Sequence, residues 1–219
     1  RRKQKALYND KFWGNTPNGG HWTIFKNGRK IKVVENLPYI LHQNYSKENL
    51  CVDIREDAIL YFNQNNISWW RQQEDNYSPT GHLVSSQIHC LNHLFAFRDD
   101  PIAIKIILQK ATNLPIDKIL QSPIDKGGYI AFEFVYKNKS LLKDNSGKYH
   151  EKYATRGANC TSRDALVYVQ LVNGNKILIP IEWKYTETYN GKEACDKSWQ
   201  RYPDLIRLEN SNLKDVYDL

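Results

Sequence analysis

Two apolar runs in the second half of the chain constrain the fold more than any other feature. They are ALVYVQLV (residues 165–172) and KILIPIEW (176–183), and Asn173-Gly174-Asn175 between them is typical of a hairpin turn. Because both runs are apolar on both faces, we expect two central strands covered on both sides of a sheet. Pro180 cannot donate a hydrogen bond to such a ladder, so it predicts a bulge or a sheet edge at that point.

The other patterns predict an α/β layout around this hairpin. Asn27-Gly28 within residues 21–34 indicates a second hairpin with a type I′ turn. Apolar spacing and turn signals predict helices over 46–66 (with Ser46 as N-cap), 82–98, 101–112 and 195–210, and a strand over 129–136. In that strand, alternation should place Phe132 and Phe134 on one face and Glu133 on the other.

The composition is that of a globular protein. Of the 219 residues, 41% are hydrophobic and 12% aromatic, and no apolar run is long enough for a membrane span. The basic N-terminus has no following apolar segment, so it does not resemble a signal peptide. The four cysteines are far apart, which predicts reduced thiols in a cytoplasmic protein. The lack of any Met predicts that the sequence comes from a longer product.

The positive charge is unevenly distributed along the chain. Residues 1–50 hold ten Lys and Arg against three Asp and Glu, which accounts for the whole net charge of +7. A second local excess lies in residues 137–163, with seven basic and two acidic residues interleaved with aromatic ones. Such segments suit a polyanion, and the alternative for the second one is a solvated, mobile loop.

Three charged residues flank the 165–183 hairpin. Asp164 precedes its first strand, and Glu182 and Lys184 lie at the end of its second. The start of one antiparallel strand lies beside the end of the other, and residues i and i+2 share a face, so the three side chains should converge. Two carboxylates suit Mg²⁺, with Mn²⁺ as the alternative ion, and the Lys184 ammonium can orient a water or neutralise a phosphorane-like transition state. The arrangement predicts phosphodiester hydrolysis.

Asp164, seventeen intervening residues and Glu182-Trp183-Lys184 resemble the signature of the PD-(D/E)XK nuclease superfamily. The stretches TGHLVSSQIHCLNHLF (80–95), RGANCTSRDA (156–165) and IEWKYTE (181–187), with the strand that carries Glu133, are similar to a bacterial restriction-endonuclease-like group of that superfamily.

This resemblance implies a fold and a division of the chain. The fold class is α/β, a restriction-endonuclease-like core with a central mixed sheet flanked by helices in the order αβββαβ. The core would occupy residues 67–219, with its final strand beginning within 213–219 or lying beyond the sequence. The resemblance does not cover residues 1–66, which we expect from their patterns to form a basic N-terminal extension, a hairpin plus a helix, packed on the core.

The resemblance and the chain order also nominate supporting residues. Gln87 lies on the helix where members of the superfamily carry an acid or Gln. Glu133 either adds a carboxylate to the site or is a surface acid on an edge strand. Arg156, Ser162 and Arg163 are close to the first acid in sequence and are candidates to bind backbone phosphates. Arg163 stands where the superfamily motif has Pro.

Other candidates are weaker. Ser85 and Ser86 can cap their helix or touch a phosphate. His89 and His93 have a zinc-binding spacing, but the sequence offers no further ligand cluster, so packing and hydrogen bonding account for them better. Tyr185 and Glu187 are expected to lie behind the motif residues, and Arg201 either reaches a phosphate or makes a surface ion pair.

The leading functional hypothesis is a Mg²⁺-dependent endonuclease acting on DNA, in restriction or phage defence. Asp164 and Glu182 would hold the metal ion and Lys184 would position the attacking water. The alternatives are a non-catalytic nucleic-acid-binding module, an RNase of the same fold, and a glycoside hydrolase that uses the two acids. Cutting both strands commonly needs two sites, so a homodimer is compatible with the hypothesis.

Overall fold

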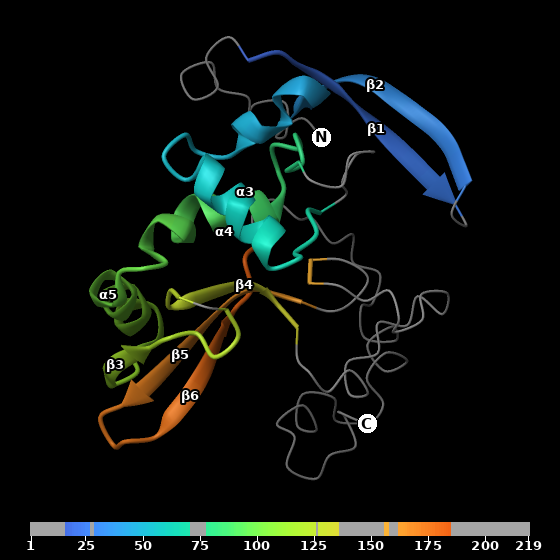
Figure 1. The fold of residues 1–219 in the computed structure, drawn as a ribbon. Coiled ribbons are helices and arrows are strands. Elements are labelled where there is room, and N and C mark those ends of the chain that lie inside the picture. Colours follow the sequence, from blue (N-terminus) through green and yellow to red (C-terminus); the bar gives the residue numbers. More distant parts are fainter. Residues whose placement is uncertain are drawn as a thin grey trace, which may run out of the picture.

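The computed structural model describes residues 16–26, 29–70, 78–125, 127–135, 156–157 and 162–184. The described strands form two sheets, and helices lie between them (Figure 1). In chain order the elements are β1 (Asn18–Lys26), β2 (Arg29–Leu41), the 3-10 helix η1 (Gln43–Asn49), α3 (Arg55–Gln64), α4 (Ser86–Leu94), the 3-10 helix η2 (Phe95–Phe97), α5 (Pro101–Thr112), β3 (Ile116–Leu120), β4 (Ile130–Phe134), β5 (Arg163–Leu171) and β6 (Lys176–Ile181).

Strand β5 is the centre of the larger sheet. Along one edge its first half pairs with β4 and its second half with β3, and β6 pairs along the other edge; all three pairings are antiparallel. The sequence patterns did not predict β3. Residues 195–210 and 213–219, expected to supply the last helix and strand, lie outside the described residues, so the αβββαβ order and the mixed sheet stay predictions.

The β5–β6 hairpin has the predicted turn. The Gly174 N–H donates to Leu171 O at 2.9 Å, Asn173 Oδ1 accepts from the Asn175 N–H at 3.0 Å, and Gly174 has a φ of +84° that favours glycine. The prediction of burial on both faces is correct for β5 only over residues 165–167, because beyond them Val169 alone is buried. It is wrong for β6, where Leu178 and Pro180 are exposed.

Pro180 therefore lies on a solvent-facing position of β6. The pairing with β5 runs through it without a shift of register, so Pro180 marks no bulge. Strand β6 has β5 as its one partner among the described strands. Pro is tolerated on such an edge strand because the N–H group that it lacks would have no neighbouring strand to bond to.

The predicted helix over 46–66 is wrong in its first half. Residues 43–49 form η1, α3 begins at Arg55, and Ser46 lies buried inside η1 instead of capping a helix. Tertiary hydrogen bonds divert the chain: Asn49 Nδ2 donates to Thr80 O at 2.9 Å and to His82 O at 3.0 Å. These long-range bonds compete with helical ones and win over local propensity.

The predicted helix over 82–98 is shorter in the structure for a similar reason. The Leu83 N–H donates to Tyr39 O in β2 at 3.0 Å, and the Ser85 N–H donates to His82 O at 3.0 Å, so the chain before Ser85 forms a bridge to β2 and a turn instead of a helix. Helix α4 then starts with Ser85 as N-cap, whose hydroxyl accepts from the Ile88 N–H at 3.4 Å. The predicted capping role of Ser85 is confirmed.

The β1–β2 hairpin is as predicted in its strands. Lys26 lies opposite Arg29, so two residues join the strands, and those two turn residues lie outside the described ones. At its end, β2 contacts the chain that precedes α4, because the Leu41 N–H donates to Gly81 O at 2.9 Å.

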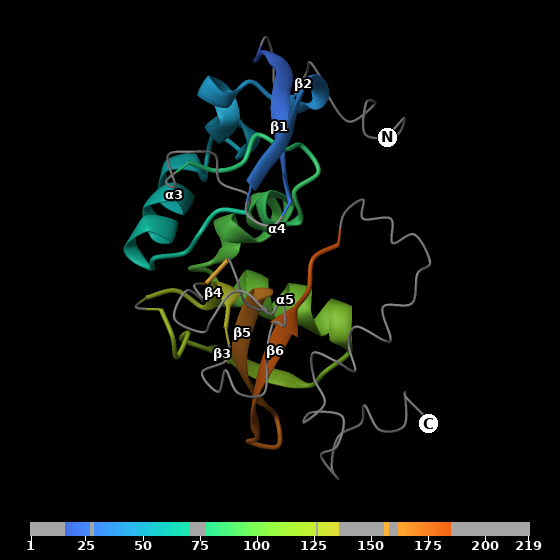
Figure 2. The ribbon, with the colours of Figure 1, turned by 90° about the vertical axis from the view of Figure 1, so that its right-hand side faces the viewer.

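The larger sheet and the helices share one hydrophobic core. It includes Phe62 of α3, Ile88 of α4, Phe132 of β4 and Val167 of β5, all of them buried. Figures 1 and 2 show α3 and α4 between the β1–β2 hairpin and the larger sheet. The predicted domain boundary at residue 66 stays a prediction. Residues of α3, before this boundary, share the hydrophobic core with the elements that follow it.

Two further observations concern predictions from composition. Cys51 and Cys90 are free thiols, and the other two cysteines lie outside the described residues. None of the helices in the described ranges has the length and apolarity to cross a membrane. Localisation in the cytoplasm stays a prediction.

Helix α5 has the predicted start at Pro101, and its cap can be tested. Asp100 Oδ1 accepts from the N–H groups of Ile102 and Ala103, both at 3.0 Å. We expect Asp100→Ala to lower the free energy of unfolding by about 1 kcal/mol in urea denaturation. Asp99→Ala removes only a carboxylate that is 76% exposed and pairs with Arg98, so it should change this value by less than about 0.5 kcal/mol. Equal losses in the two variants would contradict the capping role.

Candidate active site

Three acidic residues lie side by side at one end of the larger sheet. The β4–β5 register leaves Glu133 between the pairs Phe132–Ala165 and Phe134–Arg163, and so next to Asp164. The last β5–β6 pair, Ala165–Ile181, brings Glu182 to the other side of Asp164. All three carboxylates act electrostatically on the thiol of Cys90, which lies on α4. Its pKa is raised well above the ordinary value, first by burial and then by the charges of Asp164, Glu133 and Glu182. All three carboxylates therefore lie near enough to α4 to act electrostatically on the Cys90 thiol.

Asp164 anchors the motif segment that follows β6. Its Oδ2 accepts a hydrogen bond of 2.7 Å from the main-chain N–H of Trp183. The Trp183 ring in turn lies 4.9 Å, centroid to centroid, from the ring of His93 on α4. The segment that carries Glu182 and Lys184 is thus held to β5 by a hydrogen bond and to α4 by ring packing.

Glu182 and Lys184 share a face, as their spacing predicts. Lys184 Nζ lies 2.8 Å from Glu182 Oε1, and Arg163 Nη1 lies 3.4 Å from Glu182 Oε2. The three side chains are between 42% and 49% exposed. Ion pairs this exposed contribute little to stability, so the cluster is accessible to a ligand and can rearrange at small cost.

The donor set fits a hard divalent cation. Asp164 and Glu182 offer carboxylate oxygens at the sheet end, and Mg²⁺ commonly takes one or two carboxylates, completing its shell with water and substrate phosphate. Within the described part of the chain, no three His, Cys, Asp or Glu side chains are grouped closely enough to form a complete protein cage. The role of these two acids as metal ligands stays a prediction.

Glu133 is inside the protein, which overturns the alternative that it is a surface acid. It is 5% exposed, and its carboxylate accepts from Gln87 Nε2 at 2.9 Å and from Ser162 Oγ at 2.6 Å. Its φ of +51° lies in the left-handed region, so the simple alternation predicted for this strand is broken at this residue. Burial raises the pKa of Glu133 to about 7, although the two hydrogen bonds act in the opposite direction.

Gln87 connects this carboxylate to the chain before α4. Besides Glu133, its amide nitrogen donates to Ser68 O at 3.2 Å, and its Oε1 accepts from the Trp70 N–H at 2.7 Å. The side chain is buried, and these three bonds fix its orientation. Gln87 and Ser162 therefore lie at the site, but both point to the interior carboxylate. Ser162 binds Glu133 in this arrangement, and its predicted phosphate contact finds no support here.

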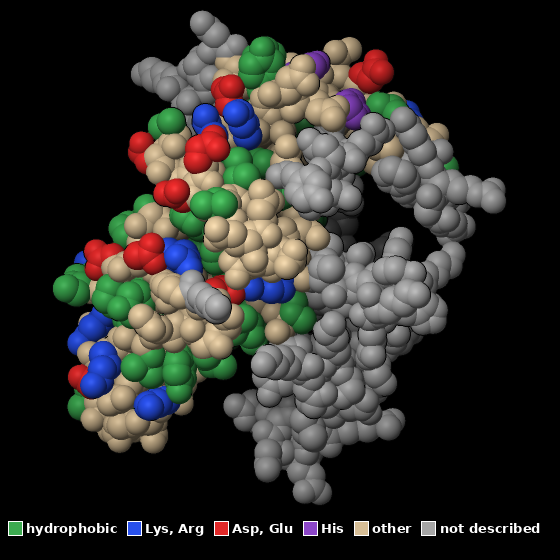
Figure 3. Space-filling model, viewed as in Figure 1, with side chains coloured by type: hydrophobic (Ala, Val, Ile, Leu, Met, Phe, Trp, Pro, Cys, Tyr) green, Lys and Arg blue, Asp and Glu red, His purple; other side chains and the backbone are tan. Residues whose placement is uncertain are grey.

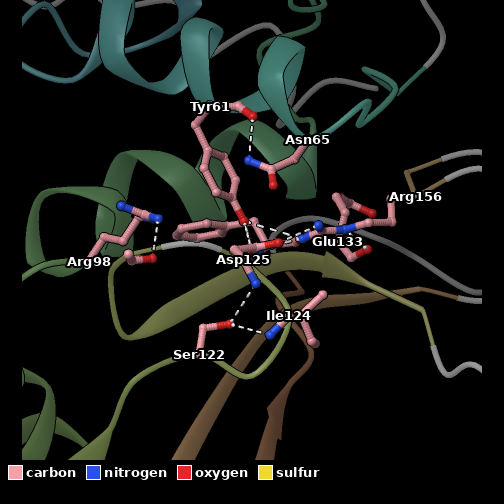
Figure 4. A network of polar contacts seen from close by, with 10 residues as sticks. Tyr61, Asn65, Arg98, Ser122, Ile124, Asp125, Glu133 and Arg156 are labelled. Atoms are coloured by element: carbon pink, nitrogen blue, oxygen red, sulfur yellow. Dashed lines mark hydrogen bonds and ion pairs between the residues drawn. The ribbon is translucent and has the colours of Figure 1, made fainter.

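Arg156 also points inward, contrary to its predicted place on a phosphate-binding surface. Its side chain is 16% exposed, and Nη1 lies 2.6 Å from Asp125 Oδ1 (Figure 4). The guanidinium also donates to the Phe132 and Glu133 carbonyls and to the Tyr61 hydroxyl. Burial alone would lower the pKa of Arg156, but the bonds to Asp125 and Tyr61 more than offset this and raise it.

Two residues of this network, Tyr61 and Asp125, were not predicted. The Tyr61 hydroxyl donates to Asp125 and accepts from the Phe132 N–H, the latter at 3.0 Å. Burial and then the Asp125 charge raise the Tyr61 pKa to about 12, so the phenol keeps its proton. Neither residue belongs to a motif, and they are 64 positions apart, so no local pattern could have paired them.

His89 and His93 make the packing contacts that the sequence favoured. His89 Nε2 is 3.0 Å from Leu83 O, and His93 Nδ1 is 2.7 Å from His89 O. Burial is the main cause that lowers the pKa of His89, which favours the neutral ring. Both rings thus bond to main-chain carbonyls.

The predicted basic surface is only partly described. Acidic and basic side chains are interspersed on the face seen in Figure 3. Of the predicted basic segments 1–50 and 137–163, residues 1–15, 27–28, 137–155 and 158–161 lie outside the described residues. Tyr185, Glu187 and Arg201 also lie outside them. Among the described residues, Lys184 and Arg163 are the half-exposed cations that pair with Glu182.

The buried state of Glu133 gives a testable pH dependence. Its pKa is about 7 in the folded protein, against 4.5 ordinarily, so between these values the unfolded chain loses a proton that the folded chain keeps. The free energy of unfolding should therefore fall by up to about 3 kcal/mol as the pH rises from 4.5 to 7 in metal-free buffer. Glu133→Gln lets the amide oxygen accept from Gln87 and the amide N–H donate to the Ser162 hydroxyl, and it should remove this part of the slope in urea denaturation. The same slope in both proteins would contradict a buried, protonated Glu133.

Comparisons with known proteins bear on the family. A protein-family model described as "Restriction Endonuclease associating with ARP" matches residues 9–217. A search of curated proteins and a search of solved structures each give no match. The match extends over nearly the whole chain, including the β5–β6 hairpin and its three charged residues. The chain therefore belongs to this restriction-endonuclease-like family.

Proposed function

We propose that the protein is a Mg²⁺-dependent endonuclease of the PD-(D/E)XK type, with Mn²⁺ as an alternative ion, that hydrolyses phosphodiester bonds in DNA. One observation carries the proposal: in a chain of this family, Asp164, Glu182 and Lys184 gather at one end of the β5–β6 hairpin. Restriction or phage defence is the biological setting that such an activity suits.

The proposed roles follow from the contacts of each side chain. Asp164 and Glu182 would hold the metal ion, which supplies Lewis-acid stabilisation of charge on the phosphate oxygens. Glu182 is now paired with Lys184 and Arg163, so its charge is already compensated by two cations. With Glu182 as a metal ligand, the Lys184 ammonium beside it would be free to donate a hydrogen bond to the attacking water. Arg163, on the rim, would bind a neighbouring phosphate.

The substrate is inferred from charge. The net charge of +7 and its concentration in residues 1–50 favour a polyanion, and binding should weaken as the salt concentration rises. DNA is the proposed substrate, and RNA is the alternative of the same chemistry. A homodimer would supply the two sites that a double-strand cut commonly needs.

The proposal predicts loss of cleavage in two conservative variants. Glu182→Gln removes a metal-binding charge and Lys184→Met removes the ammonium, and each should lower the cleavage rate by at least about 100-fold. Their ion pairs are half-exposed, so the free energy of unfolding should change by less than about 1 kcal/mol. Plasmid and oligonucleotide cleavage, with DNA and RNA substrates in Mg²⁺ or EDTA, gives the rates.

Matched controls exist on the same sheet. Lys176→Met neutralises an exposed lysine at the opposite end of β6, and Asp117→Asn neutralises an exposed acid on β3. Both should cleave at the wild-type rate. Full activity in Glu182→Gln and Lys184→Met would exclude the mechanism. Binding of DNA without cleavage in any metal would favour the non-catalytic module instead.

A further inference from the structure

A buried ion pair lies just behind the candidate active site. The Asp125 side chain is 1% exposed, and Arg156 Nη1 lies 2.6 Å from it. The main chain that carries this carboxylate is held independently of Arg156, because Ser122 Oγ accepts from the N–H groups of Ile124 and Asp125, both at 3.3 Å. Tyr61 also donates to the Asp125 carboxylate (Figure 4). Asp125 is thus an anchor that holds the guanidinium in one place.

The guanidinium bonds to two consecutive carbonyls of β4. Arg156 donates from Nη2 to Phe132 O and from Nε to Glu133 O, the latter at 3.3 Å. Consecutive carbonyls of a regular strand point to opposite edges, so one cation cannot ordinarily reach both. The φ of +51° at Glu133 turns the chain so that both face Arg156. The planar fork of Arg suits this task, whereas the single ammonium of Lys does not.

The main chain at Arg156 is fixed as well. Its carbonyl accepts from the Ser68 N–H at 2.8 Å. The next residue, Gly157, has a φ of +79°, and a Cβ there would lie 2.1 Å from Ser68 O, so only glycine fits this close approach. The chain that leads into β5 is therefore held to Glu133 at two points: by Arg156 at the carbonyl and by Ser162 at the carboxylate. Asp164 follows Ser162 by two residues.

We propose that Arg156 is a positioning residue for cleavage: anchored by Asp125, it holds the left-handed turn at Glu133 and thereby fixes the carboxylates of Glu133 and Asp164 relative to each other. This inference rests on the proposed nuclease function for its kinetic consequence, but not for its structural one. It replaces the phosphate-binding role that chain order suggested for Arg156.

Kinetics distinguish the two roles. Arg156→Lys keeps the positive charge but loses the planar guanidinium. We expect kcat to fall about 10- to 100-fold with KM nearly unchanged, because misplaced carboxylates reduce stabilisation of the transition state and do not affect substrate binding. Asp125→Asn, which keeps the shape of the anchor, should act in the same direction. Arg163→Gln, at the exposed rim, should instead raise KM and reduce the salt dependence of binding by about one unit of slope.

Two kinetic outcomes would overturn the proposal. One is a raised KM with an unchanged kcat in Arg156→Lys, which would restore the phosphate contact. The other is an equal loss of kcat in Asp100→Ala, the cap variant of α5, compared at similar stability. That result would make the effect of Arg156 one of general destabilisation.

A second measurement needs no cleavage, so it tests the positioning role even if the wild-type protein proves inactive. Carbon-13 NMR of labelled glutamate carboxyls in metal-free buffer follows Glu133, which the Glu133→Gln variant assigns. In Arg156→Lys and Asp125→Asn, the titration midpoint should move from about 7 toward 4.5, because a released carboxylate gains water. An unchanged midpoint in both folded variants would show that Arg156 does not hold Glu133.

Discussion

The pairing of β5 along both edges is the constraint on which the site depends. The registers with β4 and β6 determine which residues stand opposite Asp164, and they bring Glu133 to one side of it and Glu182 to the other. A shift of either register by one residue would turn the acid of the neighbouring strand to the opposite face of the sheet. The apolar interior of β5, from Ala165 to Val167, is buried and fixes that register by packing. The apolar hairpin thus sets the geometry of the charged residues at its end.

Around Asp164, Glu133 and Glu182, the structure separates two kinds of charged group. On the outside, Glu182, Lys184 and Arg163 are half-exposed and pair in a way that adds little stability, which leaves them available to a metal ion and a phosphate. On the inside, Arg156 and Asp125 are shielded from water. Removing one partner of such a buried pair strongly destabilises the fold, because it leaves the other charge buried and uncompensated. We infer that the inner pair holds the site rigid, whereas the outer cluster would carry out the proposed cleavage.

Glu133 lies between the two groups. It bonds to Gln87 on α4 and to Ser162 before β5, and its main chain bonds to Arg156. A left-handed conformation at a non-glycine residue is unfavourable and persists where surrounding contacts over-determine it. Here those contacts come from a helix, from the chain before β5 and from the buried arginine.

Local patterns in the sequence predicted what local chemistry determines. The turn at Gly174, the start of α5 at Pro101, and the shared face of Glu182 and Lys184 all follow from neighbours within a few residues. The failures are long-range. No local pattern shows that Arg156 turns inward to Asp125, because the partners are 31 positions apart. The break before α3 has the same origin, since Asn49 bonds to the chain near Thr80 and leaves the helical path.

The central claim is that Asp164 and Glu182 form a divalent-metal site at the end of the β5–β6 hairpin. Its most direct test is the paramagnetic broadening that Mn²⁺ causes in the amide NMR spectrum of the wild-type protein and of Asp164→Asn. The account predicts selective broadening at residues 163–165 and 182–184 at substoichiometric Mn²⁺, and loss of this pattern in the variant. Broadening centred elsewhere, or an identical pattern in Asp164→Asn, would contradict it.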